Sequence, residues 1–517
     1  TSKFIEYWFE GSQLRITYYI CIVKSGKMKF TCSILIASAF SLLSTINYAQ
    51  TSLFFSNPIQ VSTGDQYGSI RPRIALKGND VPVVVWGKGN PKNIFISSLN
   101  GSSFTTPVQV NPSGVSAYAG LNDGPNVAAE GSVVFVVYSS SLNNDGVAYC
   151  MKSIDGGQTF QDTVRVDQLQ TQAETAYSPH VVIDETGNPV VAFEKGGVSP
   201  FEQMVGRSTD GGLSFGTSVS GSTLSPGEAC ECCPPMLCVK DSTVVLLYRN
   251  NDNDIRDIYA STSFDWGQSF NQNFNIDTSN WYFLACPTQG PYGILNNDSL
   301  AAVWVSGGSG ESRALYCTFN YVTQTLGAEH FIDTVVPANT QQRSVVIEGN
   351  GDTLAVAWYD NRTGDKDCYL KYTVSGMANM SSTYVINTAT EGHQVNPHLA
   401  FAKGVFHITW QDQQTGTVWY RSAQIVPVGA EEVTQTAAVL KVFPNPAAPG
   451  AAIFLAPEVK ISEGEALLKD LSGQILYKTH LQPGWFQLPV DLKSGYYLLQ
   501  IKSGQTRMAC PLVVISE

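Results

Sequence analysis

Seven short apolar runs, each ending in an aromatic residue, recur along the chain 52 to 56 residues apart. Runs such as PVVVW and LAVAW are rich in β-branched residues and are bounded by glycine, asparagine or aspartate, which predicts buried β-strands. A further strand pattern follows each run, so about residues 65–424 contain seven repeats. Such a period indicates an array of similar β units. The runs end at Trp86, Tyr138, Phe193, Tyr248, Trp304, Trp358 and Trp410.

The two ends of this array complement each other. The seventh repeat stops after its third strand, and residues 53–62 (LFFSNPIQVS) have the pattern of the missing fourth strand. An N-terminal strand that completes the last unit closes a propeller into a ring and removes its free edges. We therefore expect a closed propeller over residues 50–425, with an open β-solenoid as the alternative.

Three copies of the motif S-x-D-x-G-x-[TS]-F lie 55 residues apart, in the second, third and fourth repeats. In such a motif the Asp carboxylate accepts hydrogen bonds from backbone N–H groups across a tight turn. The glycine two places later can adopt a positive φ, and the aromatic residue anchors the turn to its sheet. The three copies contain Ser153, Asp155, Gly157 and Phe160; Ser208, Asp210, Gly212 and Phe215; and Ser263, Asp265, Gly267 and Phe270.

This motif resembles the Asp-box of sialidase-type β-propellers. The resemblance implies an all-β propeller in which each Asp-box closes the hairpin between the third and fourth strands of a blade. Sialidases have six blades, whereas the spacing here favours seven. Their Asp-boxes lie on the face away from the active site, so the resemblance places a ligand site on the opposite face, called the open face below.

Composition agrees with an all-β chain. Of the 517 residues only 14% are charged, 45 are glycine, and no long amphipathic helical pattern is present. The net charge of −12 argues against a nucleic-acid partner, because a negative surface repels the phosphate backbone.

The N-terminal region reads as a targeting segment. Residues 28–49 combine a basic start at Met28 and Lys29, an apolar stretch from Cys32 to Leu43 and a polar end, which predicts a secretory signal peptide. Residues 1–27 precede a plausible start methionine and are expected to be absent from the mature protein. A membrane anchor is the alternative, but the apolar stretch is too short to span a bilayer. We expect no transmembrane segment in the mature chain.

The C-terminal region forms a separate unit in the sequence. A linker-like stretch at residues 426–437 precedes residues 438–517, which contain Pro444, Asn445 and Pro446, the motif DLSGQ at residues 470–474, and a strand pattern with Gly495 and Tyr496. This pattern resembles the C-terminal sorting domain of the type IX (Por) secretion system of Bacteroidetes. The resemblance implies an immunoglobulin-like β-sandwich recognised by the type IX machinery at the outer membrane and usually cleaved, leaving a secreted or surface-displayed protein. A sandwich with a binding role is the alternative.

The candidate ligand-binding and catalytic residues lie in polar loops of the open face. Arg forks suit bidentate binding of a carboxylate or sulfate. Sialidases use three arginines for the sugar carboxylate, an Asp acid and a Tyr–Glu nucleophile pair. By that resemblance Arg73, Arg249 or Arg256, and Arg343 could form the triad, and Arg73 opens an echo of the family's Arg-Ile-Pro motif. The other candidates are Asp257, Asp360, Tyr359 and Glu194, although no trusted motif contains the last two. Solvated loop residues and hydrogen bonds between blades are the alternative interpretation.

A cysteine cluster is the second unusual feature. Cys230, Cys232 and Cys233 lie in the connection into the fourth repeat, Cys238 follows, and Cys286 lies in the next such connection. These five should converge on the open face between neighbouring blades. Disulfides are the default for an exported protein, and a copper or zinc site on Cys230, Cys232, Cys233 and Cys286 is the alternative. Cys150, Cys317 and Cys368 read as small buried residues.

Three functions remain open from the sequence. The first is a surface-displayed propeller that binds a glycan or a surface protein on its open face; the second is a sialidase-like exo-glycosidase. The third is a metal-binding or redox protein that uses the cysteine cluster. Nothing in the sequence requires a cofactor, and we favour binding because no residue is identified as a catalytic acid.

Overall fold

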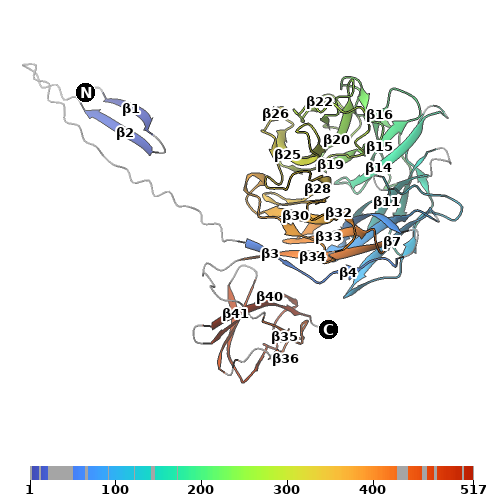
Figure 1. Cartoon of the computed structure of the whole chain (residues 1–517). Helices are drawn as coiled ribbons and strands as arrows, with labels where there is room; N and C mark the ends of the chain where they lie inside the picture. Colours follow the sequence, from blue (N-terminus) through green and yellow to red (C-terminus); the bar gives the residue numbers. More distant parts are fainter. Residues whose placement is uncertain are drawn as a thin grey trace, which may run out of the picture. The chain divides into compact units, whose positions relative to one another are not determined.

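The computed structural model divides the chain into two compact units, Ser52–Val426 and a second made of Thr1–Thr51 with Pro427–Glu517 (Figure 1). The predicted signal peptide (28–49), residues 428–437 of the predicted linker and positions 471–473 of the DLSGQ motif lie outside the described residues. Among the described residues no helix is long and apolar enough to cross a membrane. The structure describes residues 3–10, 13–20, 51–64, 68–90, 92–120, 123–140, 146–169, 171, 173–389, 391–427, 440–456, 461, 463–470, 474–503 and 506–515.

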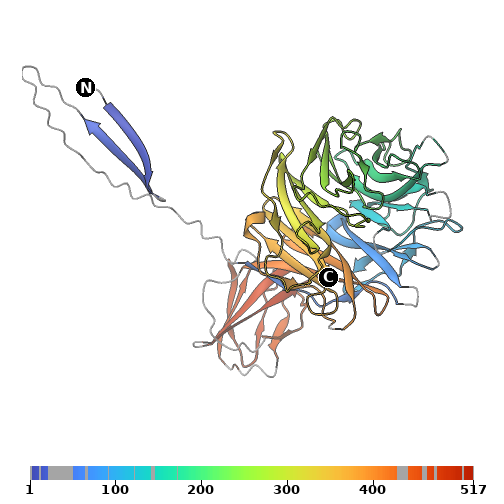
Figure 2. The same cartoon turned by 45° about the horizontal axis from the view of Figure 1, so that its top comes forward.

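Within Ser52–Val426 the described strands form seven antiparallel sheets (Figures 1 and 2). The first four are β5 (Ser69–Lys77), β6 (Val81–Lys88), β7 (Ile94–Asn100), β8 (Ser103–Phe104) and β9 (Val108–Gln109); β10 (Asn126–Glu130), β11 (Val133–Ser139), β12 (Ala148–Ser153) and β13 (Val164–Arg165); β14 (Thr175–Ile183), β15 (Pro189–Gly196), β16 (Glu202–Arg207) and β17 (Val219–Ser220); and β18 (Glu228–Ala229), β19 (Met236–Lys240), β20 (Thr243–Asn251), β21 (Ile258–Ser263) and β22 (Gln272–Asn275).

The last three sheets complete the array, and the seventh takes its outer strands from the N-terminal side of the unit. They are β23 (Tyr292–Asn296), β24 (Ser299–Ser306), β25 (Arg313–Asn320), β26 (Thr325–Leu326) and β27 (His330–Phe331); β28 (Arg343–Asn350), β29 (Thr353–Asp360), β30 (Asp367–Thr373) and β31 (Tyr384–Val385); and β32 (Gln394–Ala402), β33 (Val405–Asp412) and β34 (Thr417–Pro427) with β3 (Thr51–Phe55) and β4 (Ile59–Gln60). Two short 3-10 helices, η1 (Gly78–Asp80) and η2 (Met377–Asn379), lie in turns.

The inner strands of the seven sheets form a closed ring. β5, β10, β14, β19, β23, β28 and β32 pack on one another in this order, and β32 packs back on β5. Residues from all seven strands line a central cavity of about 600 Å³. The all-β propeller predicted from the sequence is therefore confirmed, with one sheet for each repeat.

Alternate residues of each second strand enter different hydrophobic cores. In β11, Val134 and Val136 pack toward the preceding blade, whereas Phe135 and Val137 pack toward the following one. Side chains alternate across a strand, so a strand buried on both faces reads as a continuous apolar run. The aromatic residues that end these runs are all buried, which makes them core residues rather than ligand platforms.

The three Asp-box turns lie between third and fourth strands, at β12–β13, β16–β17 and β21–β22. In the second copy, Asp210 Oδ1 accepts from Leu213 N and Ser214 N at 2.9 Å each, and Ser208 Oγ accepts from Gly212 N at 2.8 Å. The hydrogen bonds from Ser214 and Ser208 hold the pKa of Asp210 down at about 2. Each turn is thus a self-contained carboxylate cap, which explains its sequence pattern.

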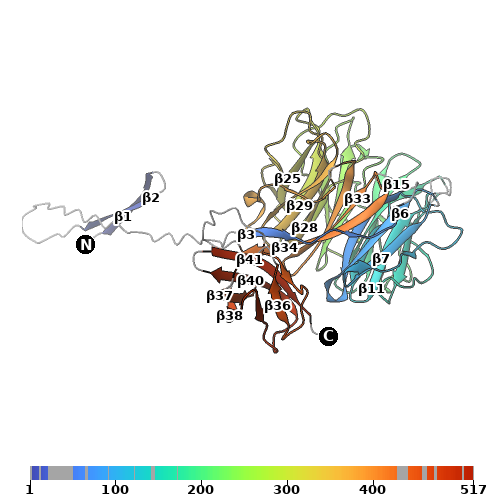
Figure 3. The same cartoon turned by 60° about the horizontal axis from the view of Figure 1, so that its bottom comes forward.

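Residues from 440 onward form two antiparallel sheets around one hydrophobic core, described here as a β-sandwich (Figure 3). One sheet contains β35 (Val442–Phe443), β36 (Ala452–Leu455) and β39 (Trp485–Gln487); the other contains β37 (Gly464–Lys469), β38 (Ile475–Leu481), β40 (Gly495–Ser503) and β41 (Thr506–Val514). Near the N-terminus, β1 (Lys3–Glu10) and β2 (Gln13–Ile20) form a hairpin.

Substitution of Leu53 by alanine tests the closing strand. Leu53 is 7% exposed and packs in the core that also contains Leu370 and Ala423. Removal of a buried Leu side chain should lower the free energy of unfolding by about 2–5 kcal/mol. The control is Phe54→Ala, because Phe54 is 42% exposed on the same strand and should change stability by less than about 0.5 kcal/mol. Urea unfolding followed by tryptophan fluorescence measures both, and equal effects would argue against a buried closing strand.

Asp210→Asn tests the carboxylate cap. The pKa of Asp210 is depressed in the folded state, so its charge stabilises the fold above the unfolded pKa, and this contribution disappears as the pH falls from about 4 to about 2. The variant should therefore unfold at a lower temperature than the wild type at pH 7, and the difference should shrink toward pH 2. A difference in melting temperature that does not depend on pH would contradict this role.

Candidate functional site

Successive strands of a blade alternate in direction, which sorts the loops into two sets. The Asp-box turns and the turns between first and second strands lie on one face, whereas the loops between second and third strands and the connections between blades lie on the open face. All the candidate catalytic residues and the cysteine cluster belong to elements near the open face or to the inner strands that start there.

Four inner strands carry a β-bulge where they leave the open face. The ladder register shifts in β5, β14, β28 and β32 at the same place in each blade. Bulges reorient side chains and are common beside functional sites. The bulged residues are Arg71, Ser178, Ser344 and Asn396, with φ of 51°, 50°, 50° and 54°.

Side-chain hydrogen bonds connect these bulges around the axis. Gln411 Oε1 accepts from Arg71 N and from Asn396 Nδ2, both at 3.3 Å. Ser344 Oγ donates to Asn396 Oδ1 at 2.9 Å, and Gln289 Oε1 accepts from Ser344 N at 2.7 Å. The bulged backbone is therefore held by polar side chains of neighbouring blades.

Arg71 and Asp123 add opposite charges to this polar ring. The stem of Arg71 crosses Gly124, where an added Cβ would lie 3.2 Å from Arg71 Cδ. Asp123 accepts from Gly124 N at 2.6 Å and from Ser178 N at 3.3 Å, and burial raises its pKa against the effect of Arg71. Burial, followed by the charge of Arg73, lowers the pKa of Arg71 to about 9. Arg71, not Arg73, is thus the arginine of this segment that interacts with a carboxylate.

Arg73 is buried and acts electrostatically on two buried histidines. Burial, followed by the charge of Arg73, lowers the pKa of His180 to about 3 and that of His398 well below its usual value, so both rings are neutral near pH 7. Their Nδ1 atoms accept hydrogen bonds from backbone N–H groups of neighbouring blades, and the Tyr292 ring contacts both histidine rings. Arg73 and the histidines therefore belong to the packing between blades.

The structure corrects the predicted arginine triad. Arg249 is fully buried and donates to three backbone carbonyls, those of Gln289 at 3.0 Å, Val305 at 2.7 Å and Arg256. Arg256 is 3% exposed and is paired with Glu231 at 3.0 Å and Asp254 at 3.5 Å. Neither guanidinium can reach a ligand, because both are used to hold loops together.

The candidate acids are also structural. Asp360 is fully buried and accepts from Trp358 Nε1 at 2.9 Å and from the Arg362 fork, with Nη2 at 2.6 Å. Asp257 accepts from Asn275 Nδ2 and Trp281 N at 3.1 Å each, and burial raises its pKa. A buried carboxylate engaged in this way anchors backbone and is not placed to protonate a substrate.

Tyr359 and Glu194 lie in different blades, on β29 and β15, and no hydrogen bond joins them among the described residues. Tyr359 lies opposite Arg343 in the β28–β29 ladder, and burial raises its pKa while Arg343 opposes the rise. Glu194 is 1% exposed, and its Oε2 has no hydrogen-bond partner within the described structure. Burial, followed by the charges of Cys230 and Asp123, raises the pKa of Glu194 well above its usual value. The effect of Cys230 on this pKa places Glu194 near the cysteine cluster.

A cavity of about 350 Å³ opens beside the connection from β22 to β23. Trp281 and Phe283 are stacked with ring centroids 5.1 Å apart, and both line the cavity. The indole of Trp281 lies so close to Gly307 that an added Cβ there would be 2.8 Å away. Arg343 also lines the cavity, and no carboxylate among the described residues forms an ion pair with it. The cavity combines an aromatic wall with an available guanidinium.

Trp281 and Phe283 were missed by the sequence reasoning. The run NWYF in the same connection as Cys286 was the available signal, because aromatic residues outside a strand have no obvious core to enter. Tyr282 and Leu284 beside them are 61% and 73% exposed.

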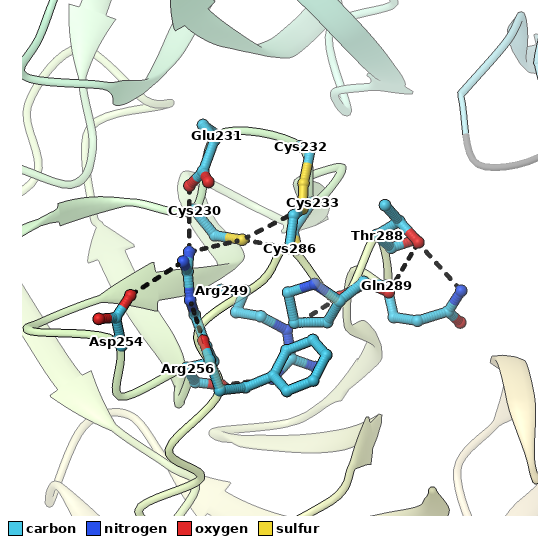
Figure 4. The surroundings of a disulfide bond; sticks show 12 residues. Cys230, Glu231, Cys232, Cys233, Arg249, Asp254, Arg256, Cys286, Thr288 and Gln289 are labelled. Atoms are coloured by element: carbon cyan, nitrogen blue, oxygen red, sulfur yellow. Dashed lines mark hydrogen bonds and ion pairs between the residues drawn. A yellow bond between two sulfur atoms is a disulfide. The ribbon is translucent and has the colours of Figure 1, made fainter.

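The four cysteines of the predicted cluster are brought together (Figure 4). Their Sγ atoms all lie within 4.8 Å of one another. Cys232 and Cys286 form a disulfide with Cα atoms 6.4 Å apart, and Cys230 Sγ lies 2.8 Å from Cys233 Sγ and 3.9 Å from Cys286 Sγ. The hydrogen bond to Cys233 raises the pKa of the Cys230 thiol.

The prediction that five cysteines converge is wrong for Cys238, which lies outside the cluster. It lies in β19, 6% exposed, and packs with Val245 and Leu247 in the core between the fourth and fifth blades. Its position within the inner strand carries it away from the loop. Cys150, Cys317 and Cys368 lie on third strands and are buried, and burial raises their pKa values.

The proposed sorting residues lie in the C-terminal sandwich. Asn445, between Pro444 and Pro446, donates to Pro511 O and accepts from Val513 N, both at 2.9 Å. Gly495 begins β40, and Tyr496 is 54% exposed. These contacts give the Pro-Asn-Pro segment a folding role at the edge of β41.

A scan against protein-family models finds no match, and a search of curated proteins finds none. Among solved structures, similarity extends to a protein of unknown function from Dyadobacter fermentans, with TM-score 0.43 and 10% identity over 72% of this chain and 99% of that one. A PL25 polysaccharide lyase, an ulvan lyase bound to -[GlcA(1-4)Rha3S]-, has TM-score 0.48 and 10% identity over 72% and 96%. A GH93 α-L-arabinofuranosidase of Fusarium graminearum with arabinobiose has TM-score 0.42 and 11% identity over 72% and 98%. At such identities the similarity does not indicate what this chain binds.

Proposed function

We propose that this protein binds an acidic glycan on its open face, in the cavity between Trp281 and Arg343. The supporting observation is the cavity itself, which places a stacked aromatic pair and a guanidinium in one space of about 350 Å³. A volume of this size accommodates a small ligand. The aromatic wall suits the apolar face of a sugar ring, because large flat side chains bury area at low entropic cost.

Arg343 favours an acidic sugar. A guanidinium binds a carboxylate or sulfate through two parallel hydrogen bonds, and Arg343 has no carboxylate ion-pair partner among the described residues. Glu311, on the same rim, accepts from Asn339 N at 2.7 Å and so is already engaged. Gln341 and Ser312 supply further polar groups for sugar hydroxyls.

Binding is favoured over hydrolysis. Glycosidases need two carboxyl groups about 5–9.5 Å apart, or a tyrosine in place of one of them. Glu311 is the sole carboxylate among the described residues that line this cavity. The alternative is an exo-α-sialidase-like hydrolase, for which the position of Tyr359 beside Arg343, near Arg71, is the specific support. Release of sialic acid that Tyr359→Phe abolishes would replace the binding proposal with this alternative.

Arg343→Ala and Trp281→Ala test the glycan site. Each should weaken binding of uronate- or sialate-containing oligosaccharides at least tenfold, about 1.4 kcal/mol, because one removes the anion fork and the other the stacking wall. Calorimetry measures the affinities, and neutral oligosaccharides should not bind. Gly307→Ala offers a third variant, since a Cβ there would push the intact indole into the cavity.

Phe264→Ala is the matched aromatic control, because Phe264 is 46% exposed within an Asp-box turn on the opposite face. It should bind like the wild type. Melting temperatures of all variants distinguish a lost site from a lost fold. Unchanged binding by Arg343→Ala and Trp281→Ala in folded protein would place the ligand elsewhere.

We also propose that the chain is exported through the signal peptide at residues 28–49 and sorted by residues 438–517 through the type IX secretion machinery. The support is the sequence resemblance, together with the compact core of the C-terminal sandwich, which is independent of the propeller cores. The mature protein would then be secreted or held on the outer surface.

Deletion of residues 438–517 tests sorting. The propeller should still fold, because its sheets and cores contain no residue of that segment, but it should accumulate in the periplasm. Cell fractionation and surface proteolysis measure its location. Tyr496→Ala, at an exposed position, separates recognition from folding. Normal surface delivery of the deleted form would contradict the proposal.

A further inference from the structure

The arrangement of the four clustered cysteines goes beyond what one disulfide needs. Cys230, Cys232 and Cys233 come from the connection between β18 and β19, and Cys286 comes from the connection between β22 and β23. Cys230 Sγ lies close to two other sulfurs, at 2.8 Å from Cys233 and 3.9 Å from Cys286. Besides the Cys232–Cys286 disulfide, the thiols of Cys230 and Cys233 lie in the same cluster, with all four Sγ atoms within 4.8 Å of one another (Figure 4).

The sulfur positions match the size of a tetrahedral metal site. Zinc–thiolate bonds are about 2.3 Å long, so the sulfurs of a tetrahedral site are about 3.8 Å apart. The four Sγ atoms lie within 4.8 Å of one another, and reduction of the Cys232–Cys286 bond would free its two sulfurs to move to that separation. Cys230 and Cys233 are fully buried, and Cys232 and Cys286 are partly buried.

Two buried arginines lie beside the sulfurs. Arg249 is fully buried and donates to backbone carbonyls, and Asp257 and Asp277 lie close enough to interact with its charge. Arg256 Nη1 lies 3.5 Å from Cys230 Sγ, and Figure 4 shows both arginines beside the cluster. Four thiolates around a divalent ion carry a net charge of −2, and the two guanidinium groups beside them would favour that negative charge.

We propose that the reduced form of this cluster is a zinc site with Cys230, Cys232, Cys233 and Cys286 as its four ligands. A four-sulfur tetrahedral set suits Zn²⁺. The backbone N–H of Gln289 donates to Cys233 and supports its sulfur from the second connection. The ion would tie together the two connections that carry Glu231 and the Trp281 loop.

The Cys232–Cys286 disulfide must be reduced before the site can bind zinc, and a phosphine can reduce it. The phosphine gives two electrons to the Cys232–Cys286 bond and becomes a phosphine oxide, with water supplying its oxygen and the two protons of the new thiols. Zn²⁺ then displaces up to four thiol protons, so binding becomes tighter as the pH rises.

Metal titration of the full chain tests the proposal. Protein reduced with a phosphine under nitrogen is loaded with Zn²⁺ or Co²⁺, desalted and analysed by elemental mass spectrometry and absorption. Reduced wild type should retain one ion per chain, and Co²⁺ should show sulfur-to-cobalt charge transfer with tetrahedral ligand-field bands. Air-oxidised wild type should retain none, and this comparison needs no substitution.

Cys230→Ser and Cys233→Ser should lose stoichiometric binding and the charge-transfer band. Cys238→Ala is the matched control, because Cys238 follows the same loop but packs in a hydrophobic core, and it should bind like the wild type. No metal in folded, reduced wild type would overturn the proposal. An equal loss of bound metal in Cys238→Ala, or resistance of the disulfide to reduction in the folded state, would also overturn it.

Discussion

The pairing of β3 and β4 with β34 is the interaction on which the propeller depends, because it closes the ring. Every second strand is buried on both faces, so each blade needs a neighbour on either side. An open array would leave two apolar sheet faces in water. Closure also brings together the inner strands that start at the open face, and with them the bulges at Arg71, Ser178, Ser344 and Asn396.

Arg249 holds together the fourth and fifth blades and the connection between them. Its guanidinium joins three backbone carbonyls and lies 5.2 Å from the Trp281 ring centroid, so it orders both the cysteine loops and the aromatic wall. Arg249, which the sequence suggested as a ligand-binding arginine, thus has a structural role beside the site. Arg343, at the equivalent edge of the sixth blade, keeps its charge available to the cavity.

The proposed glycan site and the proposed zinc site would therefore be adjacent. Cys286 both belongs to the sulfur cluster and lines the cavity with Trp281. Arg256 connects the two, since it contacts Cys230 Sγ and donates to Phe283 O at 3.3 Å. Arg256 thus contacts both the cysteine cluster and the aromatic loop.

The sequence alone determined the repeat, the closing strand and the Asp-box turns, because these rest on local patterns: strand alternation, turn chemistry and a constant period. It also brought Cys286 to the Cys230–Cys233 loop, since equivalent connections of neighbouring blades must lie close. It could not decide which arginines remain available. Arg249, Arg256 and Arg343 look alike in polar loops, and only the tertiary structure shows that backbone carbonyls and acids enclose the first two. Burial likewise decided the roles of Asp257, Asp360 and Cys238, because it depends on which distant strands pack around each residue.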